Sequence, residues 1–182
     1  FNQLRATIPT LVHAVAERNS VATVTYDGKS HEVRVCVTLV TLMQPLLDDA
    51  KIEIQAGRYF DDRDTEYGHP FIVISDSLAK KLFGTENAVD NMVRLGSQEL
   101  KVIGVFSTPK VSVIPLTYDV YVDMVPPLEP EKRKGELDSI WLKVRVLDDV
   151  DSTKAIVRNL LQRNHPESGF EIRSSYPSPT ED

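Results

Sequence analysis

The sequence has few of the residues from which metal-binding or nucleophilic sites are built. Among 182 residues there is one cysteine, Cys36, so neither an intrachain disulfide nor a cysteine-based zinc or iron–sulfur site can form. The histidines, His13, His31, His69 and His165, are never three to five residues apart, which excludes a helical histidine pair for zinc. Because Cys36 lies in an apolar run, we interpret it as a small buried core residue rather than a nucleophile.

Positive charge and long apolar runs are also scarce. The chain carries 21 Lys and Arg against 27 Asp and Glu, a formal net charge of −6, and has no long basic run, so a nucleic-acid partner is not expected. The longest uncharged run, 35–47, is shorter than the roughly 20 apolar residues of a membrane span. The chain begins with Phe1 and shows no signal-peptide pattern, and we expect it to be part of a longer protein.

What the sequence does have is a series of short strand and helix patterns separated by turn residues. Helices are predicted over 2–17, with a kink at Pro9, over 76–83, and from Asp151 or Ser152 to just before Pro166, with a short helical turn at 42–47. Strands are predicted over 21–26, 31–37, 51–55, 71–75, 92–95, 100–106, 118–122, 139–147 and 170–173. Polar loops are expected at 61–69 and 126–138, and a disordered tail at 176–182.

Several of these elements carry specific signals. Asp27-Gly28 between two strand patterns is typical of a tight hairpin turn. Ser75 or Asp76 can cap the helix that Gly84 ends, and its predicted apolar face is Leu78, Ala79, Leu82 and Phe83. In the strand at 139–147, Ile140, Leu142, Val144 and Val146 are predicted to share one face, and Trp141 is expected to be a packing residue against a second lobe.

The order of elements predicts an α+β protein of two lobes. The two ends of the chain provide a helix–strand–strand unit and a strand–helix–strand unit, while 57–124 provide a strand, a helix and a hairpin of their own. We therefore expect a βαβ lobe from 1–56 and 125–182, with a second small α/β lobe, 57–124, inserted in it.

Three short motifs resemble functional sites, and each is incomplete. Gly28-Lys29-Ser30 matches the end of a phosphate-binding loop, but the required earlier glycine is Thr23, so the hairpin interpretation is preferred. Ser77-Leu78-Ala79-Lys80 matches the Ser-x-x-Lys pattern of penicillin-recognising enzymes, whose partner motifs are absent. A hydrolase that uses Ser77 and Lys80 remains one hypothesis about function, and labelling of Ser77 by a reactive-serine probe would test it.

The acidic run Asp61 to Glu66 begins like a calcium loop. Counted from Asp62, however, the positions that require glycine and glutamate hold Tyr67 and Val73. His69 could complete an adventitious metal site, but a solvated acidic loop is the preferred interpretation. The residues themselves thus predict no catalytic site, no cofactor-binding site and no metal site.

A longer series of motifs resembles a known family. Gly57-Arg58-Tyr59-Phe60 is followed by acidic residues, by Phe71 to Ser75, by Ala79-Lys80-Lys81-Leu82-Phe83-Gly84 and by Val102-Ile103-Gly104-Val105. In order and spacing these pieces resemble the periplasmic core domain of MacB/FtsX-type ABC-transporter permeases, over nearly the whole chain. Two features depart from the family: Asn87-Ala88-Val89-Asp90 replaces an Asn-Pro-Val-Gly turn, and the segment 108–118 is short.

The resemblance implies an extracytoplasmic domain, on the periplasmic face of the inner membrane, that belongs to a permease and has no catalytic centre. It also implies that the lobe from 1–56 and 125–182 is porter-like and that 57–124 is the inserted lobe. It implies as partners the permease's own transmembrane helices, a second permease copy, a cytoplasmic ATPase domain and a periplasmic adaptor protein. ATP hydrolysis in the cytoplasm would then be coupled to export or release of an envelope cargo. The alternative is a freestanding binding or adaptor domain of the cell envelope. The isolated chain is expected to be a monomer.

Overall fold

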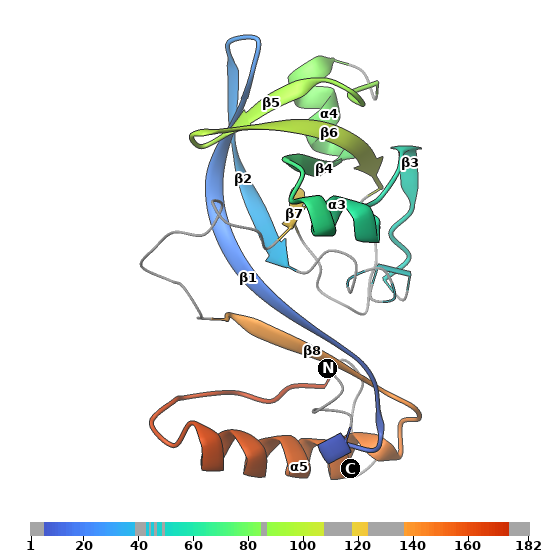
Figure 1. The fold of residues 1–182 in the computed structure, drawn as a ribbon, viewed down its shortest axis with the longest axis vertical. Coiled ribbons are helices and arrows are strands. Elements are labelled where there is room, and N and C mark those ends of the chain that lie inside the picture. Colours follow the sequence, from blue (N-terminus) through green and yellow to red (C-terminus); the bar gives the residue numbers. More distant parts are fainter. Residues whose placement is uncertain are drawn as a thin grey trace. The chain divides into compact units, whose positions relative to one another are not determined.

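A computed structural model describes residues 6–38, 43, 45, 47, 48, 50–84, 87–107, 118–123 and 137–174. The described strands and helices occur in the following order along the chain: β1 Leu11–Tyr26, β2 Lys29–Thr38, β3 Ile54–Gly57, α3 Asp62–Tyr67, β4 Phe71–Ser75, α4 Asp76–Phe83, β5 Met92–Leu95, β6 Gln98–Phe106, β7 Val120–Asp123, β8 Ser139–Val144 and α5 Asp149–Asn164 (Figure 1). The chain divides into two compact units, unit 1 (Phe1–Ala14 and Trp141–Asp182) and unit 2 (Val15–Ile140).

The eight described strands form one mixed sheet, which confirms the α+β class. Six of them pair in a closed circuit: β1 with β2, β2 with β7, β7 with β4, β4 with β6, β6 with β5, and β5 back to β1. The β2–β7 and β4–β6 pairs are parallel and the other four are antiparallel. A closed circuit leaves these strands few unpaired backbone groups, which suits a stable scaffold.

The main core of unit 2 lies on one face of these strands. Alternate residues point to it, as the period of two in a strand requires. Its fully or nearly fully buried strand residues include Val33, Val35, Val37, Ile72, Ile74, Val93, Leu95, Leu100, Val102, Val120 and Val122. Leu78, Ala79 and Leu82 of α4 close the same core, so this helix packs with the face predicted from its apolar spacing.

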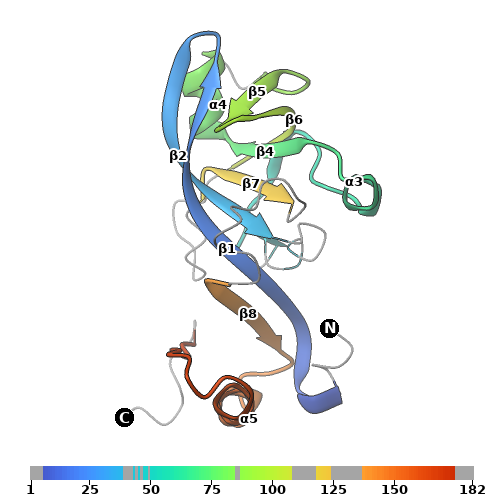
Figure 2. The same cartoon turned by 60° about the vertical axis from the view of Figure 1, so that its left-hand side comes forward.

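Both ends of α4 are built as predicted. The Ser75 hydroxyl accepts a hydrogen bond from the backbone N–H of Leu78, and Gly84 ends the helix with a positive φ of 72°. Lys29, at the start of β2, donates to the carbonyl of Leu82 at 2.7 Å, and the rings of Tyr26 and Phe83 lie 4.2 Å apart. These contacts place α4 beside the β1–β2 hairpin, as Figure 2 shows.

The predicted hairpins are confirmed. Asp27 and Gly28, with φ of 46° and 76°, form the two-residue turn between β1 and β2. Gly96 turns β5 into β6. The other predicted strands of unit 2 occur with shifted ends, at Ile54–Gly57 instead of 51–55 and at Val120–Asp123 instead of 118–122.

The predicted helix over 2–17 is wrong for its described residues. Residues 6 and 7 are helical, and a 16-residue strand, β1, begins at Leu11. Leu11 and Val15 are buried as expected, but Val12 is 41% exposed. The apolar residues three and four positions apart, which predicted a helix, are therefore only in part the buried positions of the strand. From Glu17 onward the backbone pairs with β2, and this pairing outweighs the weak helical pattern.

The other corrections concern polar or weakly apolar segments. The expected polar loop at 61–69 contains the short helix α3, and Asp64 within it is buried. Residues 170–173 form no strand, and Phe170 remains 37% exposed because no pairing holds this segment. In β8 the predicted apolar face is incomplete: Ile140 is 50% exposed, and Val146, at 57%, lies beyond the end of the strand.

Unit 1 contains the first residues of β1, most of β8 and α5. Its core is Ile8, Leu11 and Ala14, against which Leu142, Ile156, Val157 and Leu160 pack. The hydroxyls of Thr10 and Thr153 lie 2.6 Å apart. The helix begins at Asp149, earlier than the predicted Asp151 or Ser152, and ends at Asn164, before Pro166 as predicted. The predictions at 42–47, 126–138 and 176–182 fall largely or wholly outside the described residues.

Candidate functional site

The segment Gly57–Phe60, here called the strap, leaves β3 and crosses close to β6. Gly57 has a φ of 69°, and a Cβ there would lie 2.2 Å from the carbonyl oxygen of Ile103. A Cβ on Gly104 would lie 2.1 Å from the carbonyl oxygen of Arg58. The Arg58 N–H donates to the Ile103 carbonyl at 2.9 Å. Both glycines are therefore required by a close backbone approach.

Arg58 and Asp64 form a clamp that ties the strap to α3. The two guanidinium nitrogens of Arg58 donate to the two carboxylate oxygens of Asp64, at 2.5 and 2.9 Å. Burial of Asp64 acts to raise the pKa of its carboxyl, but the hydrogen bonds from Arg58 and from the Asp61 backbone N–H hold that pKa below its ordinary value. The same contact raises the pKa of Arg58. The clamp is a structural ion pair, because both oxygens of the Asp64 carboxylate already accept hydrogen bonds from Arg58.

A buried polar cluster lies under the strap. Glu17, only 1% exposed, accepts a hydrogen bond from the hydroxyl of Tyr118 at 2.8 Å, and the Cys36 thiol lies 3.6 Å from its other oxygen. The Tyr118 hydroxyl is also 2.7 Å from the amide oxygen of Asn19. Burial, and next the charge of Glu17, raise the pKa of both Cys36 and Tyr118. The thiol therefore stays protonated, in agreement with its predicted role as a core residue.

The sequence did not single out this cluster. Glu17 and Arg18 are two charged residues next to the apolar run from Leu11 to Ala16, and both are at most 3% exposed. This charged pair next to an apolar run was the feature of the sequence that could have indicated buried polar residues. It was missed because the helix predicted over 2–17 did not include Glu17 in its apolar face.

The Ser77 and Lys80 side chains have structural partners at the start of α4. The Ser77 hydroxyl lies 3.1 Å from the hydroxyl of Ser75, which caps the helix. The Lys80 ammonium lies 3.8 Å from the carboxylate of Asp76, one turn earlier. Activation of a serine needs a base within hydrogen-bond reach of its hydroxyl. The interactions around Ser77 and Lys80 are those of a helix N-terminus and do not match that arrangement.

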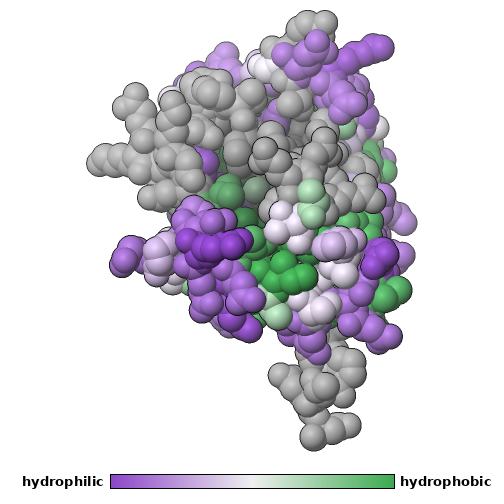
Figure 3. Space-filling view, turned by 60° about the horizontal axis from the view of Figure 1, so that its bottom comes forward, coloured by the Kyte–Doolittle hydropathy of each residue, from purple (hydrophilic) through white to green (hydrophobic). Residues whose placement is uncertain are grey.

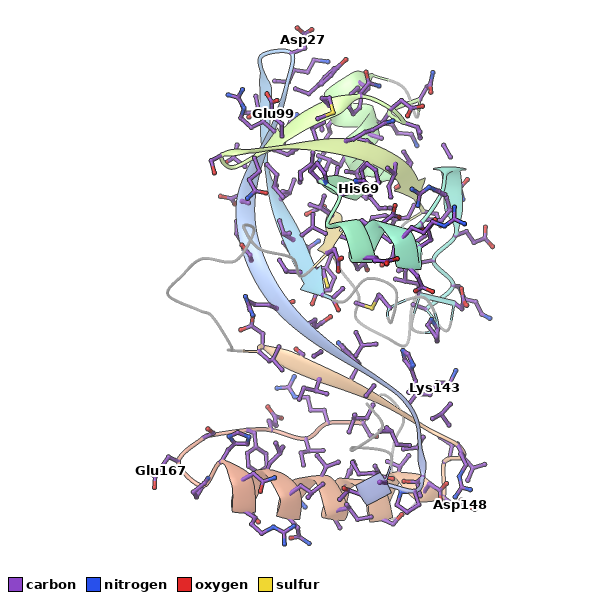
Figure 4. All side chains as sticks on the ribbon, in the orientation of Figure 1. Asp27, His69, Glu99, Lys143, Asp148 and Glu167 are labelled. Carbon is purple, nitrogen blue, oxygen red and sulfur yellow. The ribbon has the colours of Figure 1, made fainter. Side chains whose placement is uncertain are left out.

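The acidic side chains that the structure describes are distributed over several elements. Asp64 is held by Arg58, and within the described part of the chain no group of three or more His, Cys, Asp or Glu side chains could hold a metal ion. In unit 2, Asp27 lies at a hairpin tip, Glu99 on β6 and His69 next to α3, on separate elements (Figure 4). The His69 ring stacks on Phe71 at 5.1 Å.

Apolar side chains reach the surface in both units. In unit 1, Val146 and Leu147, between β8 and α5, are 57% and 55% exposed, and the indole nitrogen of the half-buried Trp141 is buried without a hydrogen-bond partner among the described residues. Figure 3 shows apolar surface bordered by hydrophilic surface on the face it presents. Among the described residues no helix is both long and apolar enough to cross a bilayer.

The turn that departs from the resembled family is built with a strained residue. Asp90 has a φ of 70°, a value that favours glycine, and its carboxylate lies 2.7 Å from the ammonium of Lys101. The side-chain amide of Asn91 donates to the Ala88 carbonyl at 3.0 Å. Asp90 thus adopts the backbone geometry that the glycine of the family's turn allows at lower cost.

Comparison of the chain with known proteins identifies a family and two relatives. The family model described as the MacB-like periplasmic core domain matches residues 1–160. The chain is 28% identical over 118 residues to the macrolide export ATP-binding/permease protein MacB of Chlorobium luteolum, covering 60% of this chain and 17% of that protein. It is 26% identical over 140 residues to the uncharacterised ABC transporter permease YknZ of Bacillus subtilis, covering 76% of this chain and 34% of that protein.

Solved structures share the fold. The extracellular domain of the transporter YknZ from Gram-positive bacteria matches with a TM-score of 0.73 and 24% identity, over 92% of this chain and 82% of that one. The periplasmic region of MacB from Actinobacillus actinomycetemcomitans matches with a TM-score of 0.72 and 21% identity, over 96% and 76%. The chain therefore belongs to the family of MacB-like periplasmic core domains and is a periplasmic or extracellular domain of a MacB-type ABC-transporter permease.

Proposed function

We propose that this domain is a non-enzymatic module through which a permease passes motion, driven by cytoplasmic ATP hydrolysis, to an envelope cargo or to a periplasmic partner protein. The family match over residues 1–160 is the observation that carries the proposal. The full-length relatives include a protein named as a macrolide exporter with ATP-binding and permease parts. The chain spans only 17% and 34% of the curated relatives, so the ATPase and the transmembrane part would lie elsewhere.

The chemistry of the domain supports a mechanical role. Three reactive side chains of the described residues have structural roles: Ser77 lies against the helix cap, Asp64 is clamped by Arg58, and burial keeps the Cys36 thiol protonated. The closed circuit of strand pairings and the strap also give unit 2 a rigid framework. A rigid body transmits displacement without losing it to internal rearrangement.

The proposed partners follow from the same role. They are the permease's own transmembrane helices, a second permease copy, a cytoplasmic ATPase domain and a periplasmic adaptor protein. Nucleic acid is not among them, because the net charge is −6. In isolation the chain is proposed to be a monomer, and light scattering that shows a dimer at micromolar concentration would contradict this.

The two-lobe arrangement also remains a proposal. It assigns 1–56 and 125–182 to a porter-like lobe and 57–124 to an inserted lobe. Strands from both proposed lobes pair within one sheet, for example β2 with β7 through Cys36 and Tyr121. Limited proteolysis tests the boundaries: first cuts near 56–57 and 124–125 would support them, and first cuts within the strand pairs would not.

The alternative is a freestanding envelope-binding or adaptor domain, and cell fractionation separates it from the permease module. An antibody against the domain is used on the native protein after separation of soluble and membrane fractions. A permease module is expected in the membrane fraction, released only by detergent and with a mass well above 20.5 kDa. A soluble envelope protein of 20.5 kDa would instead support the freestanding domain.

A further inference from the structure

The face of the unit 2 sheet that lies opposite the main core carries a buried row of polar side chains. In the β1–β2 and β2–β7 pairs, Cys36 is directly opposite Asn19 on one side and Tyr121 on the other. Directly paired residues point to the same face of a sheet, so these three side chains are neighbours on one face. Glu17 follows on the same face of β1, two residues before Asn19.

Most of this row is buried, and the strap lies against it. Tyr121 and Cys36 are completely buried, and Glu17 is 1% exposed. Tyr59 of the strap, 8% exposed, lies edge-on to Tyr121 with ring centroids 6.3 Å apart. The strap therefore places an aromatic side chain that carries a hydroxyl against this row.

Two of the buried hydroxyls differ from the others in having no partner. The Tyr118 hydroxyl is bonded to Glu17, whereas the hydroxyls of Tyr59 and Tyr121 are buried and have no hydrogen-bond partner among the described residues. They lie near the same polar groups: burial, then Cys36 and Glu17, raise the pKa of Tyr121, and burial, then Tyr121 and Cys36, raise the pKa of Tyr59.

A buried hydroxyl without a partner is disfavoured, and proteins satisfy such groups either directly or through an internal water with two to four polar partners. Around the strap, two hydroxyls can donate or accept, and the Glu17 carboxylate has remaining acceptor capacity. We propose that the hydroxyls of Tyr59 and Tyr121 share one buried water-binding site beneath the strap, next to Cys36 and Glu17. This site also accounts for a tyrosine at 59, directly before Phe60, which is equally buried and carries no hydroxyl.

Removal of the hydroxyls tests the proposal. Tyr59→Phe, Tyr121→Phe and the double variant of the 182-residue chain are unfolded in urea. Each single variant is expected to lower the folding equilibrium constant roughly fivefold, the effect of one lost hydrogen bond. Because both hydroxyls would bind the same water, the double variant is expected to lose less than the product of the two single effects. Tyr118→Phe is the control, since it removes a direct bond to Glu17 and lowers the constant in any case.

Two results would overturn the proposal. If Tyr121→Phe and Tyr59→Phe leave the folding constant unchanged or raise it, the hydroxyls lie in a dry environment. If the two effects simply multiply, the hydroxyls do not share a site. A crystal structure of the chain gives a second measurement: the shared site predicts one density peak within hydrogen-bond distance of both hydroxyls. Hydroxyls bonded directly to protein atoms, or no peak between them, would contradict it.

Discussion

At the scale of single residues, the strap depends on two glycines that serve one contact. The backbone of Gly57 and Arg58 lies against that of Ile103 and Gly104 so closely that neither glycine position has room for a Cβ. The sequence places Gly104 inside a strand pattern, where a glycine indicates a bulge or a close approach by another backbone. It could not name the partner backbone, because that contact joins segments more than 40 residues apart.

Substitution of Gly104 by alanine is therefore predicted to be strongly destabilising. The new Cβ would lie 2.1 Å from the Arg58 carbonyl oxygen, so the backbone must move, at a cost of about 3 kcal/mol or more. Gly84→Ala is the matched control: its φ of 72° is strained for alanine, but no atom lies within 4 Å, and the cost is about 1 kcal/mol. Urea unfolding measures both, and equal losses would argue against a close backbone contact.

The Arg58–Asp64 clamp is predicted to contribute stability that depends on pH. The pKa of Asp64 is lowered in the folded chain, so its contribution is fully present above the ordinary value of 3.8 and is lost as the pH falls through the folded value. Asp64→Asn is expected to cost about 2 kcal/mol at neutral pH. Thermal unfolding from pH 7 to pH 2 checks this; a gap between the two proteins that stays constant below pH 3.8 would contradict it.

At the scale of elements, α4 shows how much local sequence can specify. Its cap, its apolar face and its final glycine were all predicted from a stretch of ten residues, because each signal acts within one turn of helix. By contrast, β1 was predicted as a helix over its first residues, since its pairing partners lie elsewhere in the chain. The helix α3 was missed because six polar residues present no apolar period, and its key contact is with Arg58 outside the helix.

The cap of α4 provides a prediction at this scale. Ser75→Ala removes the acceptor for the Leu78 N–H and is expected to cost about 1 kcal/mol. Ser77→Ala is the control, because Ser77 is exposed and does not cap the helix; it is expected to change stability by less than about 0.5 kcal/mol. Chemical denaturation of both variants checks the difference. A larger loss for Ser77→Ala would show that the helix start is assembled in another way.

At the scale of the whole molecule, the two units differ in how many side chains they bury. Unit 2 has a closed circuit of strands around a large core, whereas α5 of unit 1 has Thr153 as its one buried residue among those described. The class of fold could be predicted from the sequence. The pairing order could not, because it depends on contacts such as β2 with β7, which join residues about 85 positions apart.

This difference predicts unequal protection from hydrogen exchange. Local opening costs least where few apolar side chains are buried. The amides of α5 are therefore expected to exchange at least tenfold faster than those of β4 and β6, which lie within the strand circuit. Hydrogen-exchange mass spectrometry on the intact chain measures both. Equal protection in α5 and β6 would indicate that the two units open as one.

The proposed function requires this domain to move when the permease hydrolyses ATP, and a distance measurement tests that movement most directly. Glu99 is exposed on β6, and Cys36, the only other thiol after Glu99→Cys in this domain, is buried. With a spin label at position 99 in the full permease, pulsed EPR measures the distance between the labels of two copies. Different distance distributions are expected in the nucleotide-free and ATP-trapped states. Identical distributions in both states would contradict a coupling role.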